Sequence, residues 1–136
     1  MHTTNFQSTF IEVAEDCPVA VAEPPPNKGE KKTIATLQFE LLAEAPYRYT
    51  SDDVVFTVHA DRAGIPDLER AEAREQFFSK GQACLRSSPL AKRYGWGFHF
   101  DEEGRVALVP GGRDEYEQFA ADPGVRRVKA MRSKRA

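Results

Sequence analysis

The sequence predicts an α+β fold, in which a small antiparallel sheet packs against helices from the middle of the chain. Three observations indicate this class. Residues 96–109 have the pattern of a β-hairpin, both ends of the chain contain strand-like segments, and helical patterns occupy the residues between them. Strands and helices that are segregated along the chain are typical of α+β domains.

The strands are identified by alternation and by β-branched residues. Trp96, Phe98 and Phe100 alternate with glycine and polar residues, residues 101–104 form a turn that ends in glycine, and residues 105–109 return. The N-terminal strand is expected at residues 6–14 and the C-terminal strand at residues 125–131. Together these segments supply the predicted sheet.

The helices are identified by apolar spacing and by their end signals. We expect helices at residues 34–45, 66–80 and 114–121, and a short one that begins at Pro89 and ends before Gly95. Residues 52–63 are ambiguous, because Val54–Val58 has strand-like composition. Capping residues before Asp52 and a glycine at position 64 favour a helix there.

Length and composition indicate a single globular domain over residues 1–136. The Pro-rich residues 23–32 predict a surface loop, and residues 132–136 form a basic tail. No secretory signal and no apolar run of membrane length is evident, so we expect a soluble, cytoplasmic protein with no membrane partner. Two cysteines outside any Cys-x-x-Cys pair agree with a reducing compartment.

Charge is divided unevenly along the chain. Residues 1–78 contain 7 Lys/Arg and 14 Asp/Glu, whereas residues 79–136 contain 12 Lys/Arg and 7 Asp/Glu. The first part therefore carries −7 and the second +5, which together give the net charge of −2. Such asymmetry indicates either an anionic partner for the basic part or mutual neutralisation of the two parts in the fold.

The segment 76–100 is the strongest candidate for a binding site, because it contains no acidic residue. The first reading is a non-enzymatic binding module for an anionic partner, which acts through the basic and aromatic residues of segment 80–97. The candidate ligand-binding residues are Arg86, Lys92, Arg93, Tyr94 and Trp96. Cations and aromatic rings together suit a phosphate-bearing or nucleotide-like partner, although no specific nucleic-acid-binding motif is evident. The alternative is that the alternating aromatic residues form the core and the cations are solvated.

A second reading is an enzyme or redox protein that uses Cys84, with His59 or His99 as the base. Nearby cations would favour the thiolate of Cys84, but cysteine is among the most often buried residue types, so an inert packed thiol is the favoured explanation. No cofactor motif is present, and no histidines or acids have the spacing of a metal site. A third reading is a homo-oligomer that associates through the hairpin face or an edge strand.

Several phrases of the sequence resemble a small family of uncharacterised bacterial and fungal proteins of about this length. The phrases are Thr-Thr-Asn-Phe at 3–6, residues 10–18, Thr-Ser-Asp-Asp-Val at 50–54, residues 77–86, Lys-Arg-Tyr-Gly-Trp-Gly at 92–97 and residues 128–135. The resemblance covers nearly the whole chain. It implies a soluble single-domain protein, and it assigns no activity, cofactor or catalytic residue.

Overall fold

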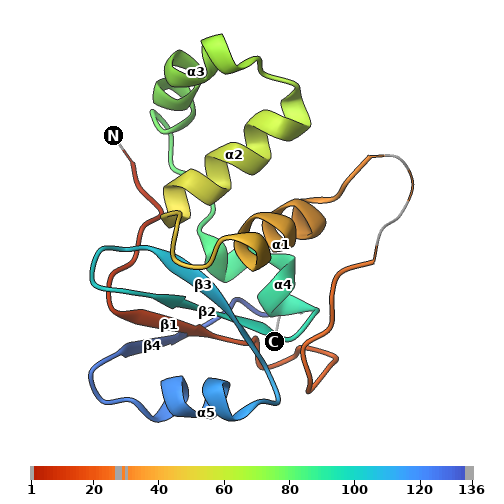
Figure 1. The fold of residues 1–136 in the computed structure, drawn as a ribbon, viewed down its shortest axis with the longest axis vertical. Coiled ribbons are helices and arrows are strands. Elements are labelled where there is room, and N and C mark those ends of the chain that lie inside the picture. Colours follow the sequence, from red (N-terminus) through yellow and green to blue (C-terminus); the bar gives the residue numbers. More distant parts are fainter. Residues whose placement is uncertain (1, 27–28, 30, 134–136) are drawn as a thin grey trace.

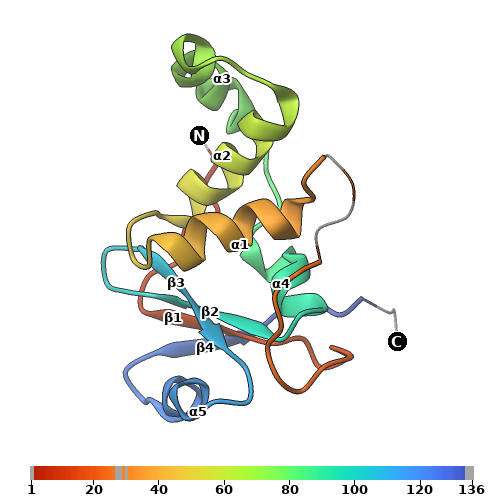
Figure 2. The same cartoon turned by 45° about the vertical axis from the view of Figure 1, so that its right-hand side comes forward.

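A four-stranded sheet lies between a layer of helices and the helix α5 (Asp114–Ala121), as Figure 1 and Figure 2 show from two directions. The structure, a computed structural model, describes residues 2–26, 29 and 31–133. The strands are β1 (Thr9–Glu12), β2 (Trp96–Phe100), β3 (Val106–Pro110) and β4 (Arg126–Lys129), in the spatial order β3-β2-β1-β4. The predicted α+β class is confirmed.

The C-terminal strand runs in a direction that the sequence did not predict. The pairs β1–β2 and β2–β3 are antiparallel, as expected, but β4 pairs with β1 in parallel. The reason is the path of the chain between β3 and β4, which passes through α5 to the opposite edge of the sheet. A helical crossover of this kind returns the next strand in the same direction as the one before it.

The remaining helical elements belong to the middle of the chain. They are α1 (Ile34–Glu44), α2 (Ser51–Ala63), η1 (Asp67–Glu69), α3 (Arg70–Phe77), η2 (Leu85–Ser87) and α4 (Pro89–Lys92). The helix choice for residues 52–63 is confirmed. Thr50 and Asp53 form a capping box at the start of α2, and Gly64 ends it with a positive φ of 69°.

The helix predicted at residues 66–80 is shorter than expected and divided in two. Pro66 is extended and precedes η1, and α3 ends at Phe77 rather than at Gly81. Side chains satisfy the last carbonyl groups in place of another helical turn. The Ser79 hydroxyl donates to the Gln76 carbonyl at 2.6 Å, and the Gln82 amide donates to the Phe77 carbonyl at 2.7 Å.

The two faces of the sheet bury different side chains. Ile11, Phe98 and Phe100 are fully buried in the main core with residues of α1, α2 and α4. On the opposite face, Phe10 contacts the rings of Tyr116 and Phe119 from α5. The alternation seen in the sequence is therefore the alternation of the sheet, with the aromatic face of β2 against the helical layer.

The N-terminal strand is shorter than the predicted 6–14, because Ser8 has a positive φ before it and the Val13 amide donates to the Tyr116 hydroxyl after it. Residues 3–5, which precede the predicted strand, bind the start of α2. The Asp52 side chain accepts hydrogen bonds from the Thr3 hydroxyl, the Thr4 hydroxyl and the Thr4 amide, at 2.6–2.7 Å. The Asn5 side chain accepts from the Asp52 amide at 2.9 Å. Ser8 then has a positive φ of 47°, and regular pairing begins at Thr9.

Two findings concern the outside of the molecule. In the described part of the chain no helix has the length and apolarity to cross a membrane.

The edge strand β4 presents the exposed residues Arg126, Arg127 and Lys129, and charged edges of this kind oppose strand pairing between molecules. Homo-oligomerisation and cytoplasmic localisation stay predictions.

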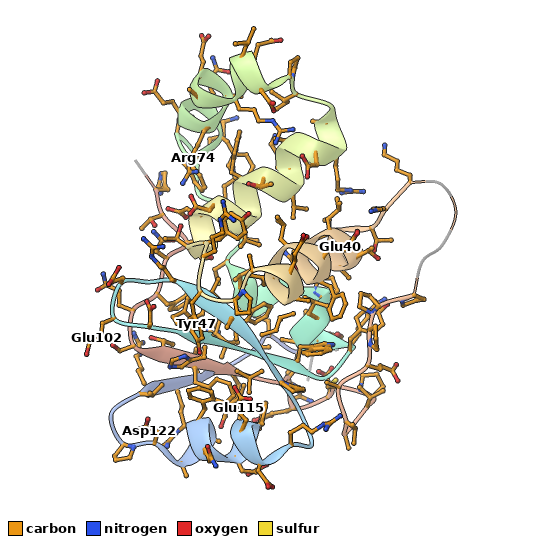
Figure 3. The ribbon with its side chains drawn as sticks, in the orientation of Figure 1. Glu40, Tyr47, Arg74, Glu102, Glu115 and Asp122 are labelled. Atoms are coloured by element: carbon orange, nitrogen blue, oxygen red, sulfur yellow. The ribbon has the colours of Figure 1, made fainter. Side chains whose placement is uncertain are left out.

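Asp53 of α2 forms an ion pair with Arg74 of α3, and Figure 3 labels Arg74. This ion pair predicts a pH dependence of stability. Burial alone would raise the pKa of Asp53, but hydrogen bonds from Thr50 and the Arg74 guanidinium, 2.9 Å away, outweigh it and hold the pKa below its ordinary value of 3.8. A lowered folded-state pKa stabilises the fold above the unfolded-state pKa, and the effect is lost as the pH falls through the folded-state pKa.

We therefore expect the free-energy difference between the wild type and Asp53→Asn to be constant above about pH 5 and to shrink below about pH 4. Urea unfolding at a series of pH values measures this difference. A difference that does not change between pH 6 and pH 2 would show that the carboxylate charge contributes nothing.

Candidate functional site

Two adjoining cavities are lined by residues of α1, α2, η2, α4 and the loop before α1. Each has a volume of about 560 Å³. They share a wall, since both are lined by Lys31, Ile34, Arg62, Ser87 and Pro89. Cavities of this size are typical of small-molecule sites.

The first cavity is strongly basic. Its lining includes cations from three separate segments of the chain, namely Lys31, Lys32, Arg62, Lys92 and Arg93. Tyr94 also lines it, and none of its described lining residues is acidic. Positive side chains that surround a concave surface raise the local concentration of anions.

Most of these cations have no acidic partner among the residues that the structure describes. Lys32 forms an ion pair with Glu40, labelled in Figure 3, at 2.7 Å. In the described part of the chain, Lys31, Arg62, Lys92 and Arg93 have no ion pair. Four cations that line the first cavity thus have no acidic partner among the described residues, an arrangement that favours an anion from solution.

The first turn of α1 adds backbone donors to this cavity. Thr33 caps the helix by accepting from the Thr36 amide at 3.2 Å, and Thr33, Ile34 and Ala35 line the cavity. The amide groups of Ile34 and Ala35 belong to the first helical turn, where no carbonyl within the helix is available to them. The positive end of the helix dipole thus faces the same space as the cations.

The short helix α4 and its two ends position Lys92, Arg93 and Tyr94. The Ser88 hydroxyl accepts from the Leu90 amide at 3.2 Å and Pro89 occupies the first turn, which fixes where α4 begins. Gly95 has a φ of 80°, and a Cβ atom there would lie 3.2 Å from the Ala22 backbone. The chain therefore turns sharply after Tyr94 and enters β2.

The second cavity is mainly apolar. Its walls include Ile34 of α1, Val55, Val58 and Ala63 of α2, and Phe77 at the end of α3. Its polar lining residues include Gln38, His59 and Cys84, and no acidic residue lines it among those the structure describes. The two cavities together form one site with a basic part and an apolar part.

Gln38 places a free hydrogen-bond donor in the second cavity. Gln38 is only 5% exposed, and its amide oxygen accepts from the Ser88 hydroxyl. The amide nitrogen has no partner among the described residues, and it is not one of the fully enclosed side-chain atoms. The nitrogen is therefore at least partly accessible, and Gln38 lines the second cavity.

Two of the sequence-predicted binding residues lie outside these cavities. The Trp96 ring packs against Phe39 at a centroid distance of 5.3 Å, and its ring N–H donates to the Glu23 carbonyl at 2.8 Å. The Arg86 guanidinium donates to the Lys129 carbonyl at 2.8 Å, beside β4. The structure brings Lys92, Arg93 and Tyr94 together, but not these two.

The candidates for covalent chemistry are also separated. Cys84 and His59 both line the second cavity, but no hydrogen bond joins them among the described residues, and the His59 ring stacks on Phe77 at 4.5 Å. His99 lies on the α5 face of the sheet, where its ring stacks on Phe119 at 4.1 Å. His99 is therefore not in a position to serve Cys84 as a base.

His99 is paired with Tyr47, which Figure 3 labels with Glu115 and Asp122 of the α5 region. The Tyr47 hydroxyl lies 2.8 Å from Nδ1 of His99. Burial lowers the pKa of His99 and raises the pKa of Tyr47, so both groups favour their neutral forms.

No group of three or more His, Cys, Asp or Glu residues in the described chain is arranged to hold a metal ion.

Sequence reasoning missed the residues that complete the two cavities: Lys31, Lys32, Arg62 and Gln38. One signal was available, since two lysines directly precede the N-cap Thr33 and so flank the positive end of a helix. Of the predicted basic tail, Arg132 and Ser133 are described, and the Ser133 amide donates to the Asp16 carboxylate at 2.9 Å. Residues 134–136 lie outside the described residues.

The chain belongs to a family of unknown function, DUF6157, whose family model matches residues 1–136. The resemblance noted in the sequence is thereby confirmed, while the bacterial and fungal distribution of the family stays a prediction. No curated protein and no solved structure matches the chain.

Proposed function

We propose that this member of the DUF6157 family is a non-enzymatic binding module for a small phosphate-bearing anion. The observation that supports this proposal best is the first cavity, whose cations Lys31, Arg62, Lys92 and Arg93 have no acidic partner in the described chain. Cations that surround a concave surface without acidic partners repel one another, and this repulsion raises the free energy of the unbound protein. A bound anion offsets the repulsion.

Phosphate suits the donors of this cavity better than a single carboxylate does. Arg62 and Arg93 each offer a planar fork of N–H donors, which matches phosphate oxygens in a two-bond arrangement. The first-turn amides of α1 add backbone donors of the kind that bind phosphate at helix N-termini. A volume of about 560 Å³ accommodates a small molecule, whereas a nucleic-acid duplex would contact only the rim.

The test is calorimetric titration of the purified protein with inorganic phosphate, a nucleoside monophosphate and a short single-stranded oligonucleotide. We expect the two small anions to bind at one site per chain, with an affinity that decreases as salt rises from 20 to about 200 mM because exposed charges are screened. Absence of phosphate binding at the lowest salt would overturn the proposal. Binding of the oligonucleotide alone would replace it with a nucleic-acid interface.

A further inference from the structure

The apolar second cavity adjoins the basic first cavity, and this arrangement bears on what else the bound anion contains. A phosphate group fills only a small part of the space, because the first cavity alone has a volume of about 560 Å³. Lys31 and Arg62 line both cavities, so an anion that they hold lies at the entrance to the apolar walls. A hydrocarbon chain attached to that anion would therefore reach the apolar lining of the second cavity, which includes Ile34 and Val58.

The buried amide of Gln38 is a second, independent feature that indicates a ligand. Gln38 is 5% exposed and lines the second cavity, and its amide nitrogen has no protein partner among the described residues. In the free protein only water can accept from this donor, so a ligand that displaces that water must supply an acceptor in its place. A carbonyl or ether oxygen on the ligand would satisfy this donor. Inorganic phosphate has no second acceptor to place in the apolar cavity, and a saturated alkyl chain on a phosphate has no acceptor at all.

We propose that the two cavities bind one amphipathic organophosphate, with its phosphate group in the first cavity and an aliphatic body that carries a hydrogen-bond acceptor in the second. This inference rests on the proposed function, since it places the phosphate in the same basic cavity. It adds the chemical class of the ligand, an acylated or otherwise aliphatic phosphate monoester, and it gives Gln38 the role of donor to the acceptor in the chain.

The first experiment uses a series of alkyl phosphates from ethyl to octyl, measured beside inorganic phosphate. Burial of each added methylene in the second cavity should raise the affinity about threefold to fourfold until the cavity is filled. Phosphate binding with no dependence on chain length would overturn this inference and leave the proposed function intact. Absence of binding by every member of the series would overturn both.

A variant of the second cavity separates specific burial from general hydrophobic association. Ala83 is exposed and lines only the second cavity, so Ala83→Glu should fold and should block the alkyl chain. We expect Ala83→Glu to bind inorganic phosphate like the wild type and to lose the dependence on chain length. An unchanged dependence in this variant would contradict the assignment of the chain to the second cavity.

Cys84 provides a readout that does not depend on calorimetry, because it lines only the second cavity. Octyl phosphate should slow the alkylation of Cys84, measured by mass spectrometry of its peptide, at least about tenfold at saturation. Inorganic phosphate should leave the rate unchanged. Equal rates with and without octyl phosphate would overturn the placement.

The role of Gln38 is tested with the near-isosteric variant Gln38→Met and two probes of equal length, an alkyl phosphate and its analogue with one ester carbonyl. Loss of the amide should weaken binding of the ester probe by at least about tenfold relative to the alkyl probe. Equal effects on the two probes would overturn the donor role.

Discussion

Replacement of both Lys92 and Arg93 by alanine is expected to reduce the affinity for phosphate at least about tenfold. Each cation lines the first cavity and has no ion pair in the described chain, so each is available for a charge-assisted hydrogen bond. Such bonds contribute about 1.5–3 kcal/mol each when desolvated, and partial exposure to water reduces that value. The measurement is titration at about 0.1 M salt, where distant surface charges are screened, with circular dichroism to verify the fold.

The matched control is Lys80→Ala/Arg126→Ala, which also removes one lysine and one arginine. Both residues are exposed, and neither lines a cavity. This control should change the phosphate affinity less than about twofold, since the removed charges are screened over distances beyond about 10 Å at 0.1 M salt. Equal losses in the two double variants would show that net charge, not the cavity, attracts the anion.

Replacement of Asp52 by alanine is expected to have the largest effect on stability, a loss of about 3 kcal/mol. Asp52 is only 3% exposed, and its carboxylate accepts from both hydroxyls of Thr3 and Thr4 and from the Thr4 amide. In the variant, Thr4 retains a buried amide group that has lost its acceptor, and the N-terminal residues lose their attachment to α2. Urea unfolding followed by circular dichroism measures the free energy.

The control for this variant is Asp67→Ala. The Asp67 side chain is 99% exposed, and it forms an ion pair with Arg70 at 3.5 Å. Exposed pairs of this kind contribute little, so the loss should stay below about 0.5 kcal/mol. If Asp52→Ala were no more destabilising than Asp67→Ala, the attachment of the N-terminus through Asp52 would be unimportant for folding.

Local patterns predicted most of the elements because their causes are local. The capping box of Thr50 and Asp53 and the glycine at position 64 marked the ends of α2, despite the strand-like residues inside it. The direction of β4 was not predictable in this way, because alternation is the same in a parallel and an antiparallel strand. That direction depends on the crossover through α5, which is a property of the whole fold.

The sequence predicted only those residues of the candidate site that are neighbours along the chain. Lys92, Arg93 and Tyr94 were found because they lie together before β2. Lys31 and Arg62 join them only when α1, α2 and α4 pack, and no local pattern reports that packing. The alternation that identified β2 also explains why Trp96 lies on the core face, beside Phe98, rather than in the cavity.

The most direct test of the basic cavity is a two-dimensional ¹H–¹⁵N NMR titration of the wild-type protein with inorganic phosphate at low salt. The perturbed amide signals should belong to Ile34, Ala35, Arg62 and residues 92–94, all of which line the first cavity. Signals of β4 should not move. Perturbations confined to β4 and the C-terminal residues, or no perturbation at all, would show that phosphate does not bind in the first cavity.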